Sequence, residues 1–384
     1  MTCVLPTVRY SEVQGRLVSA AMKARIPLTS SVEIIATCNF SCQHCYIAPG
    51  ADREDVMSLT QAKHIFAQLA AAGTLDVLLT GGEVFTHREF REIYLAAKRA
   101  GLNIYINTNA YLIGERWANF LAEWPPNGVS ISVYGLSNER YEQITRIPRA
   151  YDRVVRAVDL LLERGIKVDL KVPAMSLTVD YLPQLKALAE AKGASFRYDS
   201  IIQPHEKGDA GPVQLQLAPR QVVDLDEALD PGLESLRPGM ERSVARAPRD
   251  KVYGCGAGLF SFHVNVHGGV STCVSSRQTV GNLLEESFDV VWERLGGKVE
   301  KRFPEGHPCA TCKFRSVCAG CPATVESATG LPEGYVQQYC KITHLRAYRL
   351  GFHPTGIPRT VTEGIPANVV TPRASVARAL PILS

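Results

Sequence analysis

Short apolar runs alternate with helical periods along the first 230 residues of the chain. Runs rich in valine and isoleucine predict six strands, at residues 32–37, 76–81, 103–108, 128–134, 167–174 and 195–202. Apolar residues recur at helical spacing near 59–72, 87–100, 115–123, 150–165, 180–192 and 219–229. Such short, nearly continuous apolar strands are typical of parallel strands covered by helices. Six successive strand–helix units predict an α/β fold, an open or partial barrel.

The segments outside this repeat have weaker patterns. Apolar positions in 8–26 predict a short amphipathic lead-in helix, and 139–148 predicts a capping loop. Proline, glycine and charged residues break any long period in 203–250, which indicates a linker containing only the helix near 219–229. Residues 262–273 predict a hairpin, and the proline-rich 346–384 predicts an irregular tail.

Three cysteines follow the first predicted strand within eight residues, Cys38, Cys42 and Cys45, spaced C-x3-C-x2-C. So tight a run wraps around one object, and thiolates suit iron–sulfur clusters or zinc. A structural zinc site normally has four protein ligands, so a set of three favours a cluster with one open iron. The alternatives are a zinc site completed by His44 or a distant residue, and plain buried thiols.

The composition of the chain limits the compartment and the partners to be expected for a protein with these thiols. The net charge of +4 over 384 residues gives no reason to expect a nucleic-acid partner. Charged residues interrupt the first thirty positions, so no signal peptide is expected, and no apolar run reaches the length of a membrane span. Eleven cysteines in groups are typical of metal binding in a cytoplasmic protein rather than of disulfides. We therefore expect a cytoplasmic, non-membrane protein.

The three-cysteine motif at the end of a strand resembles that of the radical S-adenosylmethionine family. The resemblance implies a partial (β/α)6 TIM-like barrel whose cysteines hold a 4Fe–4S cluster. In that family the fourth iron is chelated by S-adenosylmethionine, which is cleaved to a 5′-deoxyadenosyl radical that takes a hydrogen atom from the substrate. The strand count made from periodicity agrees with this fold.

Further positions at predicted strand ends match cofactor contacts of the family. Gly81, Gly82 and Glu83 resemble its Gly-Gly-Glu-Pro element, with Val84 in place of proline. Glycines allow close backbone approach to a ligand, although a simple strand-to-helix turn would also explain them. We expect further cofactor contacts at three positions, each of which could instead be structural: Asn109, Ser132 and Lys171.

Seven more cysteines lie between residues 255 and 340 and resemble the SPASM domain, an auxiliary-cluster extension of this family. The resemblance implies two more 4Fe–4S clusters. The first auxiliary set would be Cys255, Cys273 and Cys321, and the second would be Cys309, Cys312, Cys318 and Cys340. Two departures stand out: only two residues separate Cys318 from Cys321, and the first set lacks a fourth cysteine. A zinc ribbon is the alternative, and Cys3 is left over.

Together the patterns predict four segments: a lead-in helix (1–30), the radical S-adenosylmethionine barrel (31–230), the SPASM domain (231–345) and a tail (346–384). No acid or base is assigned, although Tyr134, His205 and His263 fall near the predicted barrel mouth or the auxiliary domain. A lone histidine is more often structural.

The resemblance implies an enzyme that oxidatively modifies a ribosomally made peptide by a cross-link, dehydrogenation or decarboxylation. Auxiliary clusters suit a substrate radical that must lose a further electron. The alternatives are a peptide epimerase, a protein side-chain maturase, a small-molecule radical dehydrogenase, or a non-enzymatic iron–sulfur or zinc protein. Expected partners are the peptide, a separate leader-binding protein where a leader is recognised, and an electron donor such as a flavodoxin or ferredoxin.

Overall fold

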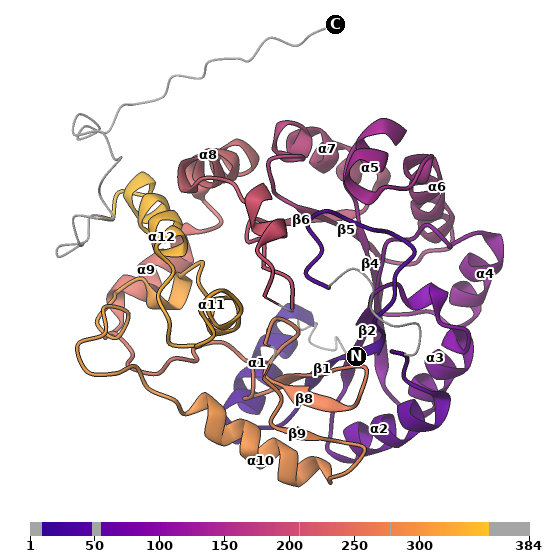
Figure 1. Ribbon diagram of the computed structural model, residues 1–384, viewed down its shortest axis with the longest axis horizontal. Coiled ribbons are helices and arrows are strands. Elements are labelled where there is room, and N and C mark those ends of the chain that lie inside the picture. The colour runs from indigo at the N-terminus through magenta and orange to yellow at the C-terminus, as the bar shows by residue number, and fades with distance from the viewer. Residues whose placement is uncertain (1–9, 48–54, 207, 277, 353–384) are drawn as a thin grey trace, which may run out of the picture.

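A curved sheet of nine strands organises the described part of the chain, in the order β6-β5-β4-β3-β2-β1-β7-β8-β9 (Figure 1). The structure is a computed structural model, and it describes residues 10–47, 55–206, 208–276 and 278–352. Neighbouring strands from β6 to β7 run parallel, and β8 and β9 add antiparallel pairs. The strands are β1 Thr29–Ile35, β2 Asp76–Gly81, β3 Asn103–Thr108, β4 Gly128–Ser132, β5 Val168–Pro173, β6 Ser195–Asp199, β7 Ser261–Val264, β8 Gly269–Ser271 and β9 Gly281–Asn282.

Helices cover the outer face of the first six strands, as expected for a partial barrel (Figure 1). They are α2 Leu59–Ala71, α3 Phe90–Arg99, α4 Glu115–Glu123, α5 Asn138–Thr145, α6 Ala150–Glu163, α7 Leu182–Lys192 and α8 Pro219–Leu229. The lead-in helix α1 is Tyr10–Ala24. The predicted α/β barrel class is thereby confirmed. Among the described helices, none is long and apolar enough to cross a membrane.

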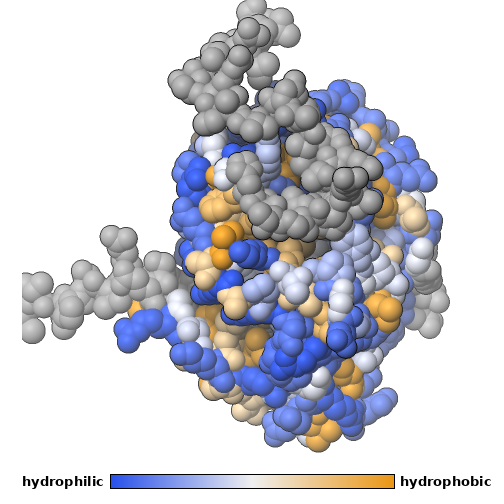
Figure 2. All heavy atoms as spheres, turned by 90° about the vertical axis from the view of Figure 1, so that its left-hand side faces the viewer, coloured by the Kyte–Doolittle hydropathy of each residue, from blue (hydrophilic) through white to orange (hydrophobic). Residues whose placement is uncertain are grey.

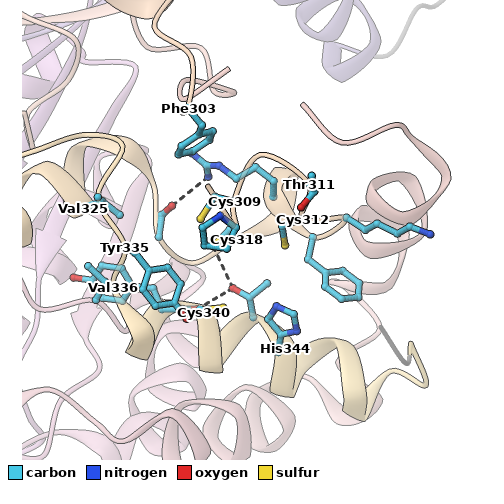
Figure 3. Close-up of a pocket in the computed structure, with 18 of the residues that line it drawn as sticks. Phe303, Cys309, Thr311, Cys312, Cys318, Val325, Tyr335, Val336, Cys340 and His344 are labelled. Atoms are coloured by element: carbon cyan, nitrogen blue, oxygen red, sulfur yellow. Dashed lines mark hydrogen bonds between the residues drawn. The ribbon is translucent and has the colours of Figure 1, made fainter. Parts of the chain in front are cut away.

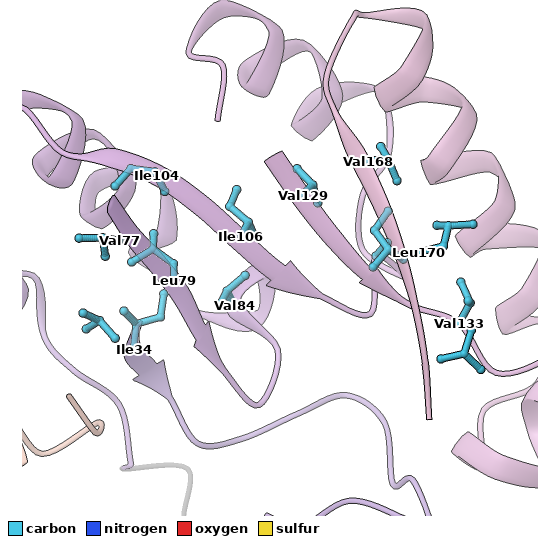
Figure 4. Close-up of a cluster of buried hydrophobic side chains, with 14 of the residues drawn as sticks. Ile34, Val77, Leu79, Val84, Ile104, Ile106, Val129, Val133, Val168 and Leu170 are labelled. Carbon is cyan, nitrogen blue, oxygen red and sulfur yellow. The ribbon is translucent and has the colours of Figure 1, made fainter. Parts of the chain in front are cut away.

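Alternation along the strands divides the barrel into an apolar outside and a polar inside. Buried aliphatic residues from successive strands, including Ile34, Leu79 and Ile106, form the layer under the helices (Figure 4). The opposite faces carry polar residues such as Ser31 on β1 and Lys171 on β5, both only partly buried. The strands are thus less continuously apolar than their sequence suggested, and polar chemistry lines the interior.

The C-terminal part lies beside the barrel, next to α8 and β7 (Figure 1). Its helices are α9 Arg237–Ala245, α10 Phe288–Val299, α11 Pro322–Thr329 and α12 Gln337–Arg349. Helix α12 packs on α8 and is tied to it by a 2.7 Å ion pair between Arg346 and the buried Asp226. The predicted hairpin at 262–273 is present as β7 and β8, and β7 continues the barrel sheet beside β1. The sheet therefore crosses the boundary predicted at residue 230.

Three local predictions were wrong. Most of the capping loop expected at 139–148 belongs to helix α5, Asn138–Thr145, because Ser137 caps this helix by accepting a hydrogen bond from the Arg140 backbone. The linker contains a second helix, α9, whose Pro238 lies in the first turn, where proline is tolerated. The first residues of the expected irregular tail belong to α12, and 353–384 lie outside the described residues, as does Cys3.

Candidate functional site

The three cysteines of the first motif lie on a loop that follows β1 at the C-terminal edge of the sheet. We call residues 38–45 the cysteine loop. Its backbone is held by the end of α5, because Ser41 N donates to Thr145 O at 3.0 Å and Gln43 N donates to Ile144 O at 3.1 Å. Helix α5, which the sequence did not predict, therefore fixes the position of the loop. The edge is the one at which barrels of this kind carry their active sites.

The side chain of Asn109, the residue after β3, contacts the same loop. The Asn109 side-chain amide donates to Asn39 Oδ1 at 2.8 Å and lies 3.6 Å from Cys38 Sγ. The Phe40 backbone N–H lies 3.4 Å from the same sulfur. Donors of this kind would stabilise a thiolate and tune a cluster bound to it. Asn39 is a contact that the sequence did not single out, since an asparagine between cysteines carries no signal of its own.

The donor set of the loop fits an iron–sulfur cluster with one open iron. It offers three thiols close enough to one another that Cys38 and Cys45 raise the pKa of Cys42, which burial already places above its ordinary range. In the described part of the chain, no group of three or more Cys, His, Asp or Glu side chains already stands in a metal-binding arrangement. Cluster binding would therefore have to remove protons and draw the sulfurs together. The ligand role of these cysteines stays a prediction.

His44, the residue that could complete a zinc site, packs against an aromatic ring. Its ring centroid lies 5.2 Å from that of Tyr134, and burial lowers the pKa of His44 to about 4. A neutral imidazole is the form that binds metals. The zinc alternative thus stays open on chemical grounds.

Gly81 and Gly82 lie directly against the segment that leads into Cys38. A Cβ on Gly81 would stand 2.0 Å from Ile35 O, and one on Gly82 would stand 2.1 Å from Thr37 O. Gly82 N donates to Ile35 O at 2.7 Å, and Gly81 has a φ of +135°, which favours glycine. The close approach that we expected toward a ligand is therefore made to the chain's own β1. Their cofactor role stays a prediction.

Glu83 is fully buried and joins β2 to the end of β3. Its carboxylate accepts hydrogen bonds from Thr108 Oγ1 at 2.7 Å, Asn109 N at 2.6 Å and Phe85 N at 3.1 Å. Burial raises the pKa of Glu83 to about 7, and these three donors oppose the rise. With its carboxylate already bound, Glu83 is suited to position Asn109 rather than to contact a cofactor through its side chain. Next to it, Val84 is fully buried in the core, which gives this position a packing role (Figure 4).

Ser132, the last residue of β4, is the register partner of Lys171 within β5. Burial, and to a smaller extent the neighbouring Arg197, lower the pKa of Lys171 to about 8. Arg197 itself is bound by Asp169 at 2.5 Å, whereas no hydrogen bond or ion pair of the Lys171 amine is found among the described residues. A partly buried amine that forms no hydrogen bond with a described residue is suited to receive an anion such as a carboxylate, and here Asp169 and Asp199 are also near enough to act on its charge.

The three candidate acids and bases have different surroundings. His263 is buried on β7, its Nδ1 2.8 Å from Ser31 Oγ and its Nε2 3.6 Å from the Glu33 carboxylate. His205 pairs with Asp209 within one loop, at 2.9 Å. Tyr134 is buried beside the cysteine loop.

The second auxiliary set lines a single cavity of about 790 Å³, the large cavity (Figure 3). Cys309, Cys312 and Cys318 come from one loop, and Cys340 comes from α12. The Thr343 hydroxyl lies 3.6 Å from Cys318 Sγ. Folding thus brings the four cysteines to one cavity, with aromatic residues such as Tyr335 in its wall. This position agrees with the ligand set that the resemblance implies, which stays a prediction.

The first auxiliary set also comes together. Burial chiefly raises the pKa of Cys273 to about 11, and Cys321 and Cys255 lie close enough to add to the rise. Cys321 caps α11, accepting a hydrogen bond from Thr324 N at 3.4 Å. Cys255 is exposed and, with Cys321, lines a second cavity of about 120 Å³, the small cavity, which Cys312 and Cys318 also line. The two sets therefore meet at the small cavity.

Comparison with known proteins adds to this geometry. Residues 32–183 match the Radical SAM superfamily. An AdoMet-dependent heme synthase of Methanosarcina barkeri is 24% identical over 323 residues, which cover 78% of this chain and 92% of the relative. The subtilosin biosynthesis protein AlbA of Bacillus subtilis is 22% identical over 77% of this chain and 67% of its own length. The structure of Streptococcus suis SuiB bound to the precursor peptide SuiA has the same fold, with a TM-score of 0.66, 17% identity and coverage of 88% of this chain and 83% of SuiB.

Proposed function

Because residues 32–183 match the Radical SAM superfamily, we propose that the chain is a radical S-adenosylmethionine enzyme that oxidatively modifies a ribosomally made peptide. It would hold S-adenosylmethionine and three 4Fe–4S clusters. Bound at a cluster, S-adenosylmethionine supplies a 5′-deoxyadenosyl radical that takes a hydrogen atom from the substrate, and the protein supplies position and exclusion of water.

The cysteine loop would hold the cluster that binds the cofactor. Cys38, Cys42 and Cys45 are its three thiols, and Asn109 lies within hydrogen-bonding reach of the first of them. Glu83 holds the Asn109 backbone at 2.6 Å, so it keeps this contact in place. The partly buried Lys171 amine on β5, beside Ser132, would receive the cofactor carboxylate.

The oxidative character of the proposal rests on one observation, the gathering of seven cysteines into two neighbouring sets beside the barrel. A substrate radical can be quenched by regaining a hydrogen atom or can lose an electron to a nearby acceptor. Two auxiliary clusters would provide that acceptor, so the substrate would lose two electrons in all. Cross-linking, dehydrogenation and decarboxylation meet this requirement, and epimerisation does not.

The choice of a peptide is supported by likeness to AlbA, a bacteriocin biosynthesis protein, and to SuiB, whose structure holds a precursor peptide. The proposal includes an electron donor of the flavodoxin or ferredoxin class and, where a leader is recognised, a separate leader-binding protein. A second candidate substrate is an iron tetrapyrrole, because the heme synthase match spans 92% of that relative.

A substrate comparison tests the proposal. Anaerobically reconstituted enzyme is given S-adenosylmethionine and dithionite, with either a short peptide encoded beside its gene or an iron tetrapyrrole carrying propionates. We expect the peptide to stimulate 5′-deoxyadenosine formation and to lose two hydrogens, or carbon dioxide and two hydrogens, by mass spectrometry. Stimulation by the tetrapyrrole alone would replace the peptide with the second candidate. The variant Cys42→Ala is the control and should give no 5′-deoxyadenosine.

A further inference from the structure

The small cavity has an unusual set of charges. Five cationic side chains line it and no carboxylate does, although aspartate and glutamate together nearly equal lysine and arginine in the whole chain. Its cations are Arg246, Arg249, Lys251, Lys313 and Arg315. The same cavity is lined by cysteines of both auxiliary sets. Positive charge is thus concentrated at a cavity that cysteines of both predicted clusters line.

Arg315 is the inner cation, and the clusters themselves would explain it. It is half-buried, donates to Val252 O at 2.6 Å and Gly320 O at 3.3 Å, and lies 5.4 Å from the centre of the Phe303 ring. Its Nε is buried without a hydrogen-bond partner, and it forms no ion pair with a described carboxylate. A buried cation needs a counter-charge. The one thiolate-bound cluster that Cys309 and Cys312 would share could provide it, because both thiols are close enough for Arg315 to oppose the rise in pKa that burial causes.

The outer cations are different, because they face solvent. Arg246, Arg249 and Lys313 are exposed, and no ion pair of their side chains is found within the described ranges. We call these three residues the basic patch. Two acidic residues close by in sequence or space are already paired: Glu300 binds Lys251 at 2.5 Å, and Asp250 binds Arg302. The basic patch is therefore free to attract an anionic partner.

The basic patch lies around Cys255, a predicted cluster ligand. It is exposed and lines the same cavity, so a cluster bound to it would lie close to the surface. This side of the molecule, which carries α9 and α12, is largely hydrophilic with hydrophobic patches between (Figure 2). Exposed charges that have no ion-pair partner attract a protein of opposite charge and so raise the rate of association at this surface.

We propose that the basic patch around Cys255 is the docking surface for a small acidic one-electron carrier protein of the flavodoxin or ferredoxin class. This proposal rests on the proposed function, because it requires a cluster at the first auxiliary set. Each docking event moves one electron between carrier and cluster, so one is reduced as the other is oxidised, and no covalent bond forms. A cavity of about 120 Å³ is below the usual 300–1,000 Å³ of small-molecule sites, which favours a surface contact over an enclosed ligand.

An acidic peptide substrate fits these observations less well. Peptide chemistry would take place at the mouth of the barrel, beside the cysteine loop, whereas the basic patch surrounds cysteines assigned to electron transfer. A carrier protein also needs only charge complementarity and a short path to the cluster, and both are present here.

Binding of an acidic flavodoxin to the reconstituted full chain tests the proposal. Isothermal titration calorimetry at 50 and 200 mM salt would compare the parental protein with Arg246→Glu/Arg249→Glu. The matched control is Arg99→Glu/Arg116→Glu, which changes two exposed arginines on α3 and α4, away from the C-terminal helices (Figure 1). We expect Kd to rise about tenfold or more in the patch variant and with added salt, and less than about twofold in the control. Iron content per chain reports whether each variant is folded.

Three results would overturn the proposal. Equal weakening in both double variants would show a general charge effect. Equal affinity for an acidic protein of matched charge without a redox centre would show an unspecific anion surface. Displacement of flavodoxin by an acidic peptide at equal affinity would assign the basic patch to peptide binding. Formation of 5′-deoxyadenosine by the parental enzyme with dithionite is measured separately. If none formed, the proposed function would be wrong, and the calorimetric result on flavodoxin binding would be judged by itself.

Discussion

Glu83 shows how much a single buried residue organises at this site. Three donors from two segments meet its carboxylate, and one of them is the backbone of Asn109, whose side chain reaches the cysteine loop. The sequence marks Glu83 only as part of a motif after β2. Its partner Thr108 was not predicted, since a threonine at a strand end has many uses. The structure thus gives the residue a positioning role.

Substitution of Glu83 by glutamine should lower stability and change its dependence on pH. Burial raises the pKa of Glu83 to about 7, above its ordinary value of 4.5, so the folded protein binds the extra proton between these values. The stabilisation is complete below pH 4.5 and is lost as pH rises through 7, by roughly 3 kcal/mol. Glu83→Gln removes this dependence and, by turning an amide N–H toward a donor, costs about 1–3 kcal/mol.

The measurement for Glu83 is the unfolding midpoint at several pH values from 5 to 8.5. The exposed Glu92→Gln on α3 is the control and should keep the parental pH profile. If Glu83→Gln and the parental protein lost stability in parallel across this range, the account of the buried carboxylate would be wrong.

Substitution of Cys42 by alanine should stop cleavage of S-adenosylmethionine while leaving the auxiliary clusters in place. The reason is that the cysteine loop offers only three thiols, and a cluster with two thiol ligands would be lost. We expect about eight irons per chain instead of about twelve, and no 5′-deoxyadenosine above background. Cys3→Ala, at the one cysteine outside the predicted sets, is the control. Parental cleavage by Cys42→Ala would contradict the assignment.

At the scale of elements, the end of β2 and the end of β1 form one unit. Gly81 and Gly82 allow β2 to press against residues 35–37, the segment that leads into the cysteine loop. Helix α5 holds the loop from the other side through Ile144 and Thr145. The position of the loop therefore depends on three elements that are far apart in the sequence.

Substitution of Gly82 by alanine should move the cysteine loop without unfolding the barrel. The new Cβ would meet Thr37 O at 2.1 Å, so the backbone must shift, at a cost of roughly 1–3 kcal/mol. We expect lower iron occupancy and slower 5′-deoxyadenosine formation, measured on the same sample. Gly114→Ala is the control, because no heavy atom lies within 4 Å of its added Cβ and its φ is −112°. Equal losses in both variants would contradict this reading.

The strands and several helices were predictable because apolar residues recur in them at a regular spacing. The strands β2 and β3 and the helices α4 and α8 have the predicted bounds. Helix α12 was missed because its buried face carries Tyr339, Thr343 and His344, which give little apolar signal and are buried only by the surrounding fold. Helices α5 and α9 were hidden by nearby glycine and proline. Local pattern therefore found the elements with strong periodicity and failed where packing decides.

The site was predictable to a similar extent. Spacing and resemblance pointed to the cysteines, because thiols at short intervals have few structural uses. The Arg315 side chain, the small cavity and the basic patch could not be found in the same way, since they depend on segments 246–255 and 312–318 meeting in space. The two glycines were found as part of a motif, and the structure adds a packing role against residues 35–37, while their cofactor role stays a prediction.

At the scale of the molecule, barrel and C-terminal part are joined by one sheet and by α8 packed on α12. Seven of the predicted ligands lie in the C-terminal part, and the three of the cysteine loop lie on the barrel. This division separates the site of cofactor cleavage from the proposed electron acceptors. The two activities should therefore respond differently to substitution.

Substitution of Cys312 by alanine should spare cofactor cleavage more than product formation. Cys312 lines both cavities, so its loss would disturb the second auxiliary cluster and the wall next to the first. We expect 5′-deoxyadenosine to form at close to the parental rate while product per 5′-deoxyadenosine falls about tenfold or more. The ratio is measured by liquid chromatography and mass spectrometry. The reverse pattern, with product retained and cleavage lost, would exclude an electron-accepting role for the C-terminal part.

The central claim is that ten cysteines hold three clusters in sets of three, three and four. It is tested most directly by iron and sulfide content per chain after anaerobic reconstitution, with 5′-deoxyadenosine measured on the same sample. The account predicts about twelve irons, an equal amount of sulfide, and cleavage. About four irons with zinc would make the C-terminal part a zinc module. Zinc alone, without cleavage of S-adenosylmethionine, would contradict the whole account.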